Sequence, residues 1–218
     1  MITAASLQKL VDERNKTLPA GQHFTAIPVA WASRCAAALE TERANADLVT
    51  PVRIRHFMAQ VAHETGGFRK LVESTRYTNP QRLVELFSNV HGVEHARRLV
   101  EEGPEAIGCC IYANKLGNGG IESGDGYRFR GRGFLMNTGR ANYKDVERYS
   151  GLKVVVEPDL LGRPEGAAVA AIAFWKDHHL NAAADIDQVD EVTRIINGKK
   201  LEGRANRAAW AQAARAVW

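Results

Sequence analysis

The stretch from residue 51 to residue 68 reads PVRIRHFMAQVAHETGGF. Its large apolar residues recur at the i, i+3, i+4 and i+7 spacing of one buried helix face: Ile54, Phe57, Met58 and Val61. Pro51 suits the first turn of a helix and the glycines at 66 and 67 suit its end, so a helix is expected over most of this stretch. Glu64 falls at the edge of the apolar stripe, where its carboxyl group is expected to be partly buried.

A second carboxylate, Glu73, follows Glu64 after nine residues, in a polar segment. Glycoside hydrolysis requires one protonated carboxyl group, which donates to the leaving oxygen, and one ionised carboxylate as base or nucleophile. Glu64, against apolar neighbours, suits the acid, and Glu73, in a polar loop, suits the base. Two glutamates at this spacing are also common as surface acids, so the spacing alone leaves both interpretations open.

The rest of the chain has the periodicity of helices on both sides of one irregular segment. Helices are expected over 3–14, 28–44, 93–101, 105–114, 140–150, 165–180, 185–197 and 204–217, and another is expected to begin at Asn79-Pro80. Seven glycines in the 18 residues 116–133 exclude a regular helix there and favour a loop that lines a cleft over a linker. The fold is therefore predicted to be mainly α, with at most a small β-hairpin around Tyr127, Phe129 and Leu135.

The length of 218 residues suits one large domain or two small lobes, and no repeat or boundary divides the sequence. We therefore treat residues 1–218 as a single domain. The formal charge of +4 favours an anionic partner such as bacterial cell wall, a membrane surface or nucleic acid, although a soluble basic protein without such a partner would look the same. The three cysteines lack the spacing of a disulfide framework or a zinc site, so buried free thiols are expected.

Neither a metal nor a cofactor is expected. His91 and His95 have the i, i+4 spacing of zinc ligands, but no further acid or histidine completes the site. His56 and His63 lie seven residues apart on one expected helix, which is not ligand spacing.

Arginines alternate with aromatic residues from 127 to 132. Such a pattern could contact a phosphate backbone with base stacking, form an exposed hairpin face, or supply guanidinium groups that orient catalytic carboxylates. No phosphate-binding loop motif is present.

Three separated motifs follow one another along the chain. The first is HETGGF at 63–68. The second consists of YANKLGNG at 112–119 and SGDGYRFRGRG at 123–133, continued by TGRANY at 138–143, and the third consists of TRIING at 193–198 and GRANR at 203–207. In this order they resemble the three signature blocks of glycoside hydrolase family 19, the family of chitinases and phage endolysins. The resemblance runs from about residue 52 to 218 and leaves an N-terminal helical part, residues 1–50, outside it.

The resemblance implies a lysozyme-like, two-lobed helical fold with a deep substrate cleft. It implies single-displacement hydrolysis of β-1,4-linked N-acetylated sugars with inversion. By position, Glu64 is the general acid, Glu73 is the general base, and Thr138 helps to hold the attacking water.

The same resemblance assigns residues that contact or support the substrate: His63, Tyr112, Arg132, Asn142, Asn197 and Arg204. Arg132 is expected to orient the acid. Met136 stands where members commonly carry a glutamine, two residues before the Ser/Thr position, so one of the family's hydrogen bonds to the substrate is not expected here. Glu122, in the glycine-rich loop, is a rival candidate for the base.

The short interval from Glu64 to Glu73 favours the compact phage type over the plant type. Neither a signal peptide nor a chitin-binding module is expected, so the expected function is that of an endolysin that hydrolyses peptidoglycan. We expect a monomer made in the host cytoplasm that acts on the cell wall or periplasm after release, with no nucleic-acid partner and no stable membrane insertion. A chitinase, or a non-catalytic cell-wall-binding protein on the same scaffold, is the alternative.

Overall fold

The structure is a computed structural model that describes all of residues 1–218. It contains twelve α-helices and no β-strand, which confirms the mainly α prediction. The chain forms two compact units. Unit 1 comprises Met1–Leu71, Gly133–Leu135 and Leu161–Trp218, and unit 2 comprises Val72–Arg132 and Met136–Leu160. None of the helices is long and apolar enough to span a bilayer.

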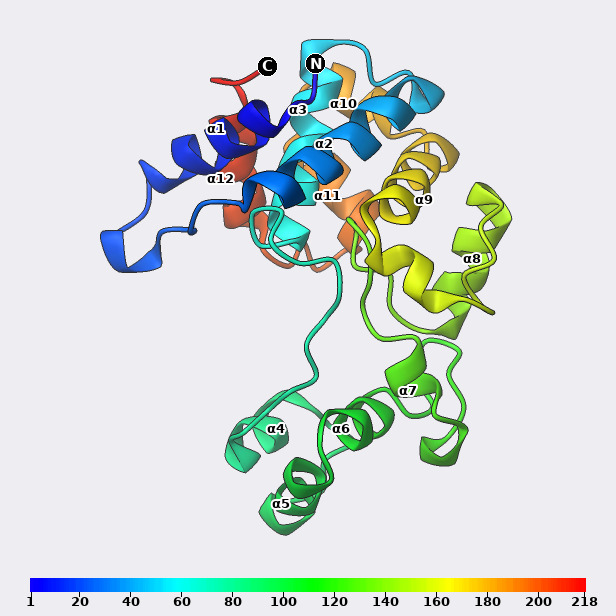
Figure 1. The fold of residues 1–218 in the computed structure, drawn as a ribbon. Coiled ribbons are helices and arrows are strands. Elements are labelled where there is room, and N and C mark those ends of the chain that lie inside the picture. Colours follow the sequence, from blue (N-terminus) through cyan, green and yellow to red (C-terminus); the bar gives the residue numbers. More distant parts are fainter. The chain divides into compact units, whose positions relative to one another are not determined.

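Unit 1 holds seven α-helices: α1 (Ala4–Asn15), α2 (Val29–Glu42), α3 (Pro51–Glu64), α9 (Pro164–Asp177), α10 (Leu180–Asp185), α11 (Val189–Asn197) and α12 (Arg204–Ala214). In Figure 1, α1 lies beside α12 and α2 beside α9, and each of these pairs is in contact. The short helix α10 separates the two helices expected over 165–180 and 185–197. His179 and Asp187 take left-handed backbone conformations at its two ends, with φ of 53° and 55°, and these interrupt the helical run.

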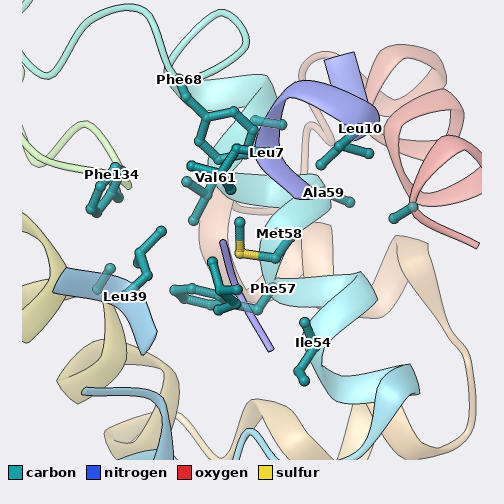
Figure 2. Packing of buried hydrophobic residues seen from close by; sticks show 14 of the residues in the cluster. Leu7, Leu10, Leu39, Ile54, Phe57, Met58, Ala59, Val61, Phe68 and Phe134 are labelled. Atoms are coloured by element: carbon teal, nitrogen blue, oxygen red, sulfur yellow. The ribbon is translucent and has the colours of Figure 1, made fainter. Parts of the chain in front are cut away.

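Helix α3 forms the centre of unit 1. Thr50 caps its N-terminus by accepting from the Arg53 amide, and Pro51 occupies its first turn. Every residue from 56 to 62 is buried, so this helix is enclosed on all sides rather than on the predicted stripe alone. Figure 2 shows the stripe of α3 among side chains from α1, α2, the loop after α3 and the segment Gly133–Leu135, namely Leu7, Leu10, Leu39, Phe68 and Phe134.

Residues 1–50 are part of this core. The Thr3 hydroxyl accepts from the Ser6 amide and the Ser6 hydroxyl accepts from the Thr3 amide, so a capping box fixes the start of α1. Leu7 and Leu10 of α1, and Leu39 of α2, are fully buried. The N-terminal part is therefore an integral layer of unit 1.

Unit 2 holds the shorter helices α4 (Pro80–Leu86), α5 (Val93–Glu102), α6 (Pro104–Ile111), α7 (Asp125–Arg128) and α8 (Arg140–Ser150). Its small apolar core is formed by α4, α5 and α6, with Leu83, Leu99, Ile107 and Ile111 among its buried side chains. Asn79 caps α4 by accepting from two backbone amides, as the Asn79-Pro80 pair predicted.

The hairpin expected around Tyr127 and Phe129 is not formed. Residues 125–128 instead form the single turn α7, which packs against α6 through two glycines. A Cβ on Gly126 would lie 2.4 Å from the Gly108 carbonyl oxygen, so only glycine permits this approach. The extended pairing in this region consists of two isolated antiparallel bridges, Val72 with Arg132 and Arg132 with Asn137.

Candidate active site

Glu64 is the last residue of α3, as predicted. The helix ends there because Gly66 and Gly67 take positive φ values of 59° and 73°, which glycine adopts without strain. The Thr65 hydroxyl donates to the Val61 carbonyl and accepts from the Phe68 amide, so the chain leaves the helix along a fixed path. The side chain of Glu64 is 16% exposed, which places its carboxylate at the boundary of the core of unit 1.

Arg207 of α12 orients the Glu64 carboxylate. Its Nη2 donates to Glu64 Oε1 at 2.5 Å and its Nη1 donates to Gln60 Oε1 at 2.5 Å. Its Nε donates to the Glu202 carbonyl at 3.1 Å, and the residue is only 1% exposed. A buried guanidinium with three acceptors has little freedom to move, so one oxygen of Glu64 is held and Oε2 remains available to a substrate.

The sequence assigned the orientation of the acid to Arg132, and the structure assigns it to Arg207 instead. Arg132 lies in unit 2, is 2% exposed, and donates to the Arg128 carbonyl, the Tyr143 hydroxyl and Asp159. It therefore braces the backbone of unit 2. The spacing of Arg207 with Trp210, Ala211 and Ala214 marks the buried face of α12 and could have identified Arg207 from the sequence.

His63 precedes Glu64, and its ring packs against the loop before α12. A Cβ on Gly203 would lie 2.5 Å from His63 Cε1 and 2.7 Å from Nε2, so the glycine makes room for the imidazole. The Nδ1 atom is buried without a partner. Burial, and secondarily the charge of Arg207, lowers the pKa of His63 to about 4, so the ring is neutral at neutral pH.

The shift on His63 predicts a pH dependence of stability. The unfolded state binds a proton near pH 6.5 that the folded state binds only near pH 4, so the wild type should lose stability as pH falls through this window. His63→Gln lacks this contribution, whereas the other histidines are common to both proteins. Between pH 7 and pH 4, the free energy of unfolding measured with urea should fall by roughly 2 kcal/mol more in the wild type than in His63→Gln, after allowance for partial solvent screening. Equal losses in the two proteins would contradict this prediction.

The other two residues assigned from the third motif lie on the surface of unit 1. Asn197 ends α11, and its Oδ1 accepts from the Glu202 amide at 2.8 Å, which closes the loop 198–203. Arg204 is exposed and pairs with Asp190 at 2.6 Å. Asn197 therefore shapes the loop that packs on His63, and Arg204 fixes the start of α12 to α11.

Glu73 is held by two donors within unit 2. The Tyr112 hydroxyl donates to Oε1 at 2.8 Å, and the Gly131 amide donates to Oε2 at 3.0 Å. The Glu73 amide in turn donates to the Gly131 carbonyl at 2.8 Å. Burial and the adjacent Glu73 carboxylate raise the pKa of Tyr112, so its hydroxyl keeps its proton and remains a donor. Each oxygen of the Glu73 carboxylate has a second lone pair, so it can also accept a hydrogen bond, and then a proton, from a further donor.

The Thr138 hydroxyl shares one small space with Glu73. A Cβ on Gly131 would lie 3.2 Å from both Glu73 Oε2 and Thr138 Oγ1, so the two oxygens flank the same side of this glycine. Thr138 Oγ1 donates its own proton to the Met136 carbonyl at 3.0 Å. The hydroxyl is therefore left as an acceptor, and a water that reaches both oxygens can donate one hydrogen to each.

Asn142, on the first turns of α8, extends this group of residues. Its Nδ2 donates to the Thr138 carbonyl at 2.7 Å, which fixes the amide while Asn142 remains exposed. The structure thus brings Glu73, Tyr112, Thr138 and Asn142 together in unit 2, and Glu64, His63 and Asn197 together in unit 1.

A curated relative decides the family. A protein of Haemophilus influenzae (strain ATCC 51907 / DSM 11121 / KW20 / Rd), described as a glycosyl hydrolase family 19 domain-containing protein, is 34% identical over 161 residues, which are 74% of this chain and 78% of the relative. The chain belongs to glycosyl hydrolase family 19. It is accordingly a glycoside hydrolase. No protein-family model matches it.

Solved structures of family 19 chitinases share the fold. Chitinase C from Streptomyces griseus HUT6037 matches 99% of this chain and 92% of its own with a TM-score of 0.56 at 17% identity. A bacterial family 19 chitinase matches 98% of this chain and 94% of its own with a TM-score of 0.52 at 18% identity. The matched share includes most of residues 1–50, so the N-terminal helices belong to the shared fold although the sequence resemblance began after them.

Glu122, the rival base, lies in a different part of unit 2 of this family 19 chain. It belongs to the short turn Ile121–Ser123, is exposed, and lines a cavity with Lys115 and Asn114. Glu122 is not among the hydrogen-bond partners of the Tyr112 hydroxyl, the Thr138 hydroxyl or the Gly131 amide. The donors that would support a base are gathered on Glu73.

No group of three or more His, Cys, Asp or Glu residues in the structure is placed to hold a metal ion. His91 and His95 stack with 5.9 Å between their ring centroids, and the His95 Nδ1 accepts from the His91 amide. This contact explains their spacing as part of the local turn before α5.

Loss of the Arg207 guanidinium should destabilise the family 19 chain. In Arg207→Met the Gln60 and Glu64 oxygens lose their donor, and a partly buried carboxylate is left without a counter-charge. We expect a fall of about 3 kcal/mol in the free energy of unfolding, measured with urea at pH 7. Arg204→Met, three residues away on the exposed face of the same helix, is the matched control and should change the midpoint little, because its ion pair is solvated. Similar losses in both variants would contradict the assignment.

Proposed function

We propose that the chain is an endolysin-type enzyme that hydrolyses the β-1,4 glycosidic bonds of bacterial peptidoglycan with inversion of configuration. The proposal rests on the difference between the hydrogen bonds that hold the two glutamates. Glu64 is held through one oxygen by Arg207 and keeps Oε2 free. Glu73 is held as an acceptor by two donors, and its Oε2 lies with Thr138 Oγ1 on the same side of Gly131.

The proposed reaction is a single displacement. Glu64 Oε2 gives its proton to the glycosidic oxygen as the bond from that oxygen to the anomeric carbon breaks. A water that donates one hydrogen to Glu73 and the other to Thr138 keeps a lone pair directed away from both, and this lone pair attacks the anomeric carbon. Glu73 receives the proton that the water loses. The products are a chain end with a free 4-hydroxyl and a new reducing end of inverted configuration.

Charge supports peptidoglycan as the substrate. Unit 1 carries seventeen Lys and Arg against thirteen Asp and Glu, and unit 2 carries twelve against twelve, so the formal excess of +4 belongs to the unit that bears Glu64. Lys70 follows the glycines that end α3, and Lys199 and Lys200 lie in the loop that packs on His63. All three are exposed, with no acidic partner. Peptidoglycan bears carboxylates and chitin is neutral, so this cationic surface favours the former.

The test compares purified sacculi with colloidal chitin and N-acetylglucosamine hexamers, using mass spectrometry of the products and NMR of the newly formed anomer. We expect release from sacculi and an α-anomer as the first product. Release from chitin alone would identify a chitinase instead. A β-anomer would overturn the inverting mechanism, and no release from either polymer would leave a non-catalytic wall-binding protein.

A further inference from the structure

A cavity in unit 2 lies outside the groups that hold Glu73. Its volume is about 540 Å³, and it is open to solvent. One cation, one anion, two amides and an exposed apolar residue line it, together with parts of the neighbouring turns: Lys115, Glu122, Asn89, Asn114 and Ile121. A site with both charges and amide groups suits a small zwitterion rather than a neutral sugar.

Lys115 is anchored in the wall of this cavity. Its Nζ donates to the Ser88 hydroxyl and to the Ile111 carbonyl, both at 3.2 Å. An ammonium group has three protons, so one remains for a ligand. The positive charge itself has no carboxylate partner, and an anionic group is the natural complement to it.

Glu122 supplies the opposite charge. Its carboxylate folds back over Gly120, where a Cβ would lie 2.4 Å from Glu122 Oε1, and both residues line the cavity. The glycine therefore permits a position of the carboxylate that any other residue would obstruct. Glu122 makes no ion pair, so both of its oxygens can accept from a cationic ligand.

The wall between these charges is fixed. Both hydrogens of Asn89 Nδ2 are donated, to the Cys110 and Ala113 carbonyls at 3.0 Å, which leaves Oδ1 as a free acceptor. The Asn114 amide donates to the Gly119 carbonyl at 2.9 Å and closes the loop that carries Lys115. This loop begins at Tyr112, whose hydroxyl holds Glu73. A ligand in the cavity would therefore lie on the same loop that supports the candidate base.

We propose that this cavity binds the stem peptide of peptidoglycan through an amino-acid end that bears both a carboxylate and an ammonium group. Lys115 receives the carboxylate and Glu122 receives the ammonium. Diaminopimelate, the third residue of many stem peptides, has such an end, and chitin has none. This inference rests on the proposed function, because the stem peptide belongs to the same peptidoglycan substrate whose sugar chain is cleaved.

The first experiment measures binding without sugar. The probe is the free tripeptide L-Ala–γ-D-Glu–meso-diaminopimelate, titrated into the full chain by calorimetry and followed by NMR. We expect Lys115→Met and Glu122→Gln each to weaken binding by roughly tenfold. Lys144→Met and Glu101→Gln, exposed residues outside the cavity, are the matched controls. The tripeptide with L-lysine in place of diaminopimelate lacks the distal carboxylate, so it should bind more weakly to the wild type and lose little more in Lys115→Met.

The second experiment compares kcat/KM on glycan strands with and without their stem peptides. We expect the wild type to prefer the peptide-bearing strand by roughly tenfold, and the two cavity variants to lose this preference. No tripeptide binding, or equal binding by wild type and cavity variants, would overturn the inference even if both strands are cleaved. Failure to cleave any strand would overturn the proposed function, while the tripeptide titration would still decide the cavity separately.

Discussion

Glu64→Gln is expected to lower turnover of peptidoglycan by roughly 10²–10⁴-fold with the fold intact, because a positioned general acid contributes about that factor. Glutamine has nearly the same shape, and its carbonyl oxygen can still accept from Arg207 at the position of Oε1. It has no proton to give to the glycosidic oxygen. The measurement is product release from sacculi, with circular dichroism and urea unfolding as the check on the fold.

Two comparisons make this result specific. Glu202→Gln removes an exposed acid from the loop beside α12 and should leave turnover within about twofold of wild type, because surface substitutions away from the chemistry have small effects. An aryl glycoside with a dinitrophenolate leaving group needs no protonation, so Glu64→Gln should retain most of its activity on it. Unchanged turnover of sacculi by Glu64→Gln would indicate a binding role for this carboxylate.

Glu73→Gln should produce a loss of similar size, roughly 10²–10⁴-fold, for a different reason. The glutamine carbonyl can still accept from one of the two donors, the Tyr112 hydroxyl or the Gly131 amide, but the side-chain amide cannot accept the proton of the attacking water. Because water must be activated whatever the leaving group, the dinitrophenyl glycoside should be affected as strongly as the natural bond. This contrast separates the base from the acid.

Glu122→Gln is the comparison that decides between the two candidate bases. On peptide-free strands it should lose less than about tenfold, because Glu122 has none of the donors that hold Glu73. A loss in Glu122→Gln that exceeds the loss in Glu73→Gln would reverse the assignment of the base.

The sequence by itself determined the local structure around Glu64. The spacing of Ile54, Phe57, Met58 and Val61 predicted the buried face of α3, and Pro51 and the glycine pair predicted its ends, because these signals act within one or two turns of chain. Family resemblance then selected Glu64, Glu73 and Thr138, whose surroundings the structure describes.

Only the tertiary structure decided which arginine forms an ion pair with Glu64. Arg132, Arg204 and Arg207 all lie in motifs of the resemblance, and an isolated motif does not reveal which guanidinium is buried. Arg207 meets Glu64 because α12 packs along α3, a contact between segments 143 residues apart in sequence. The same holds for Gly203, which makes room for His63, and for Gly131, which leaves space between Glu73 and Thr138. Periodicity and capping are local properties that a sequence records directly, whereas the partner of a buried charge depends on which helices pack together, and that is settled by the whole core.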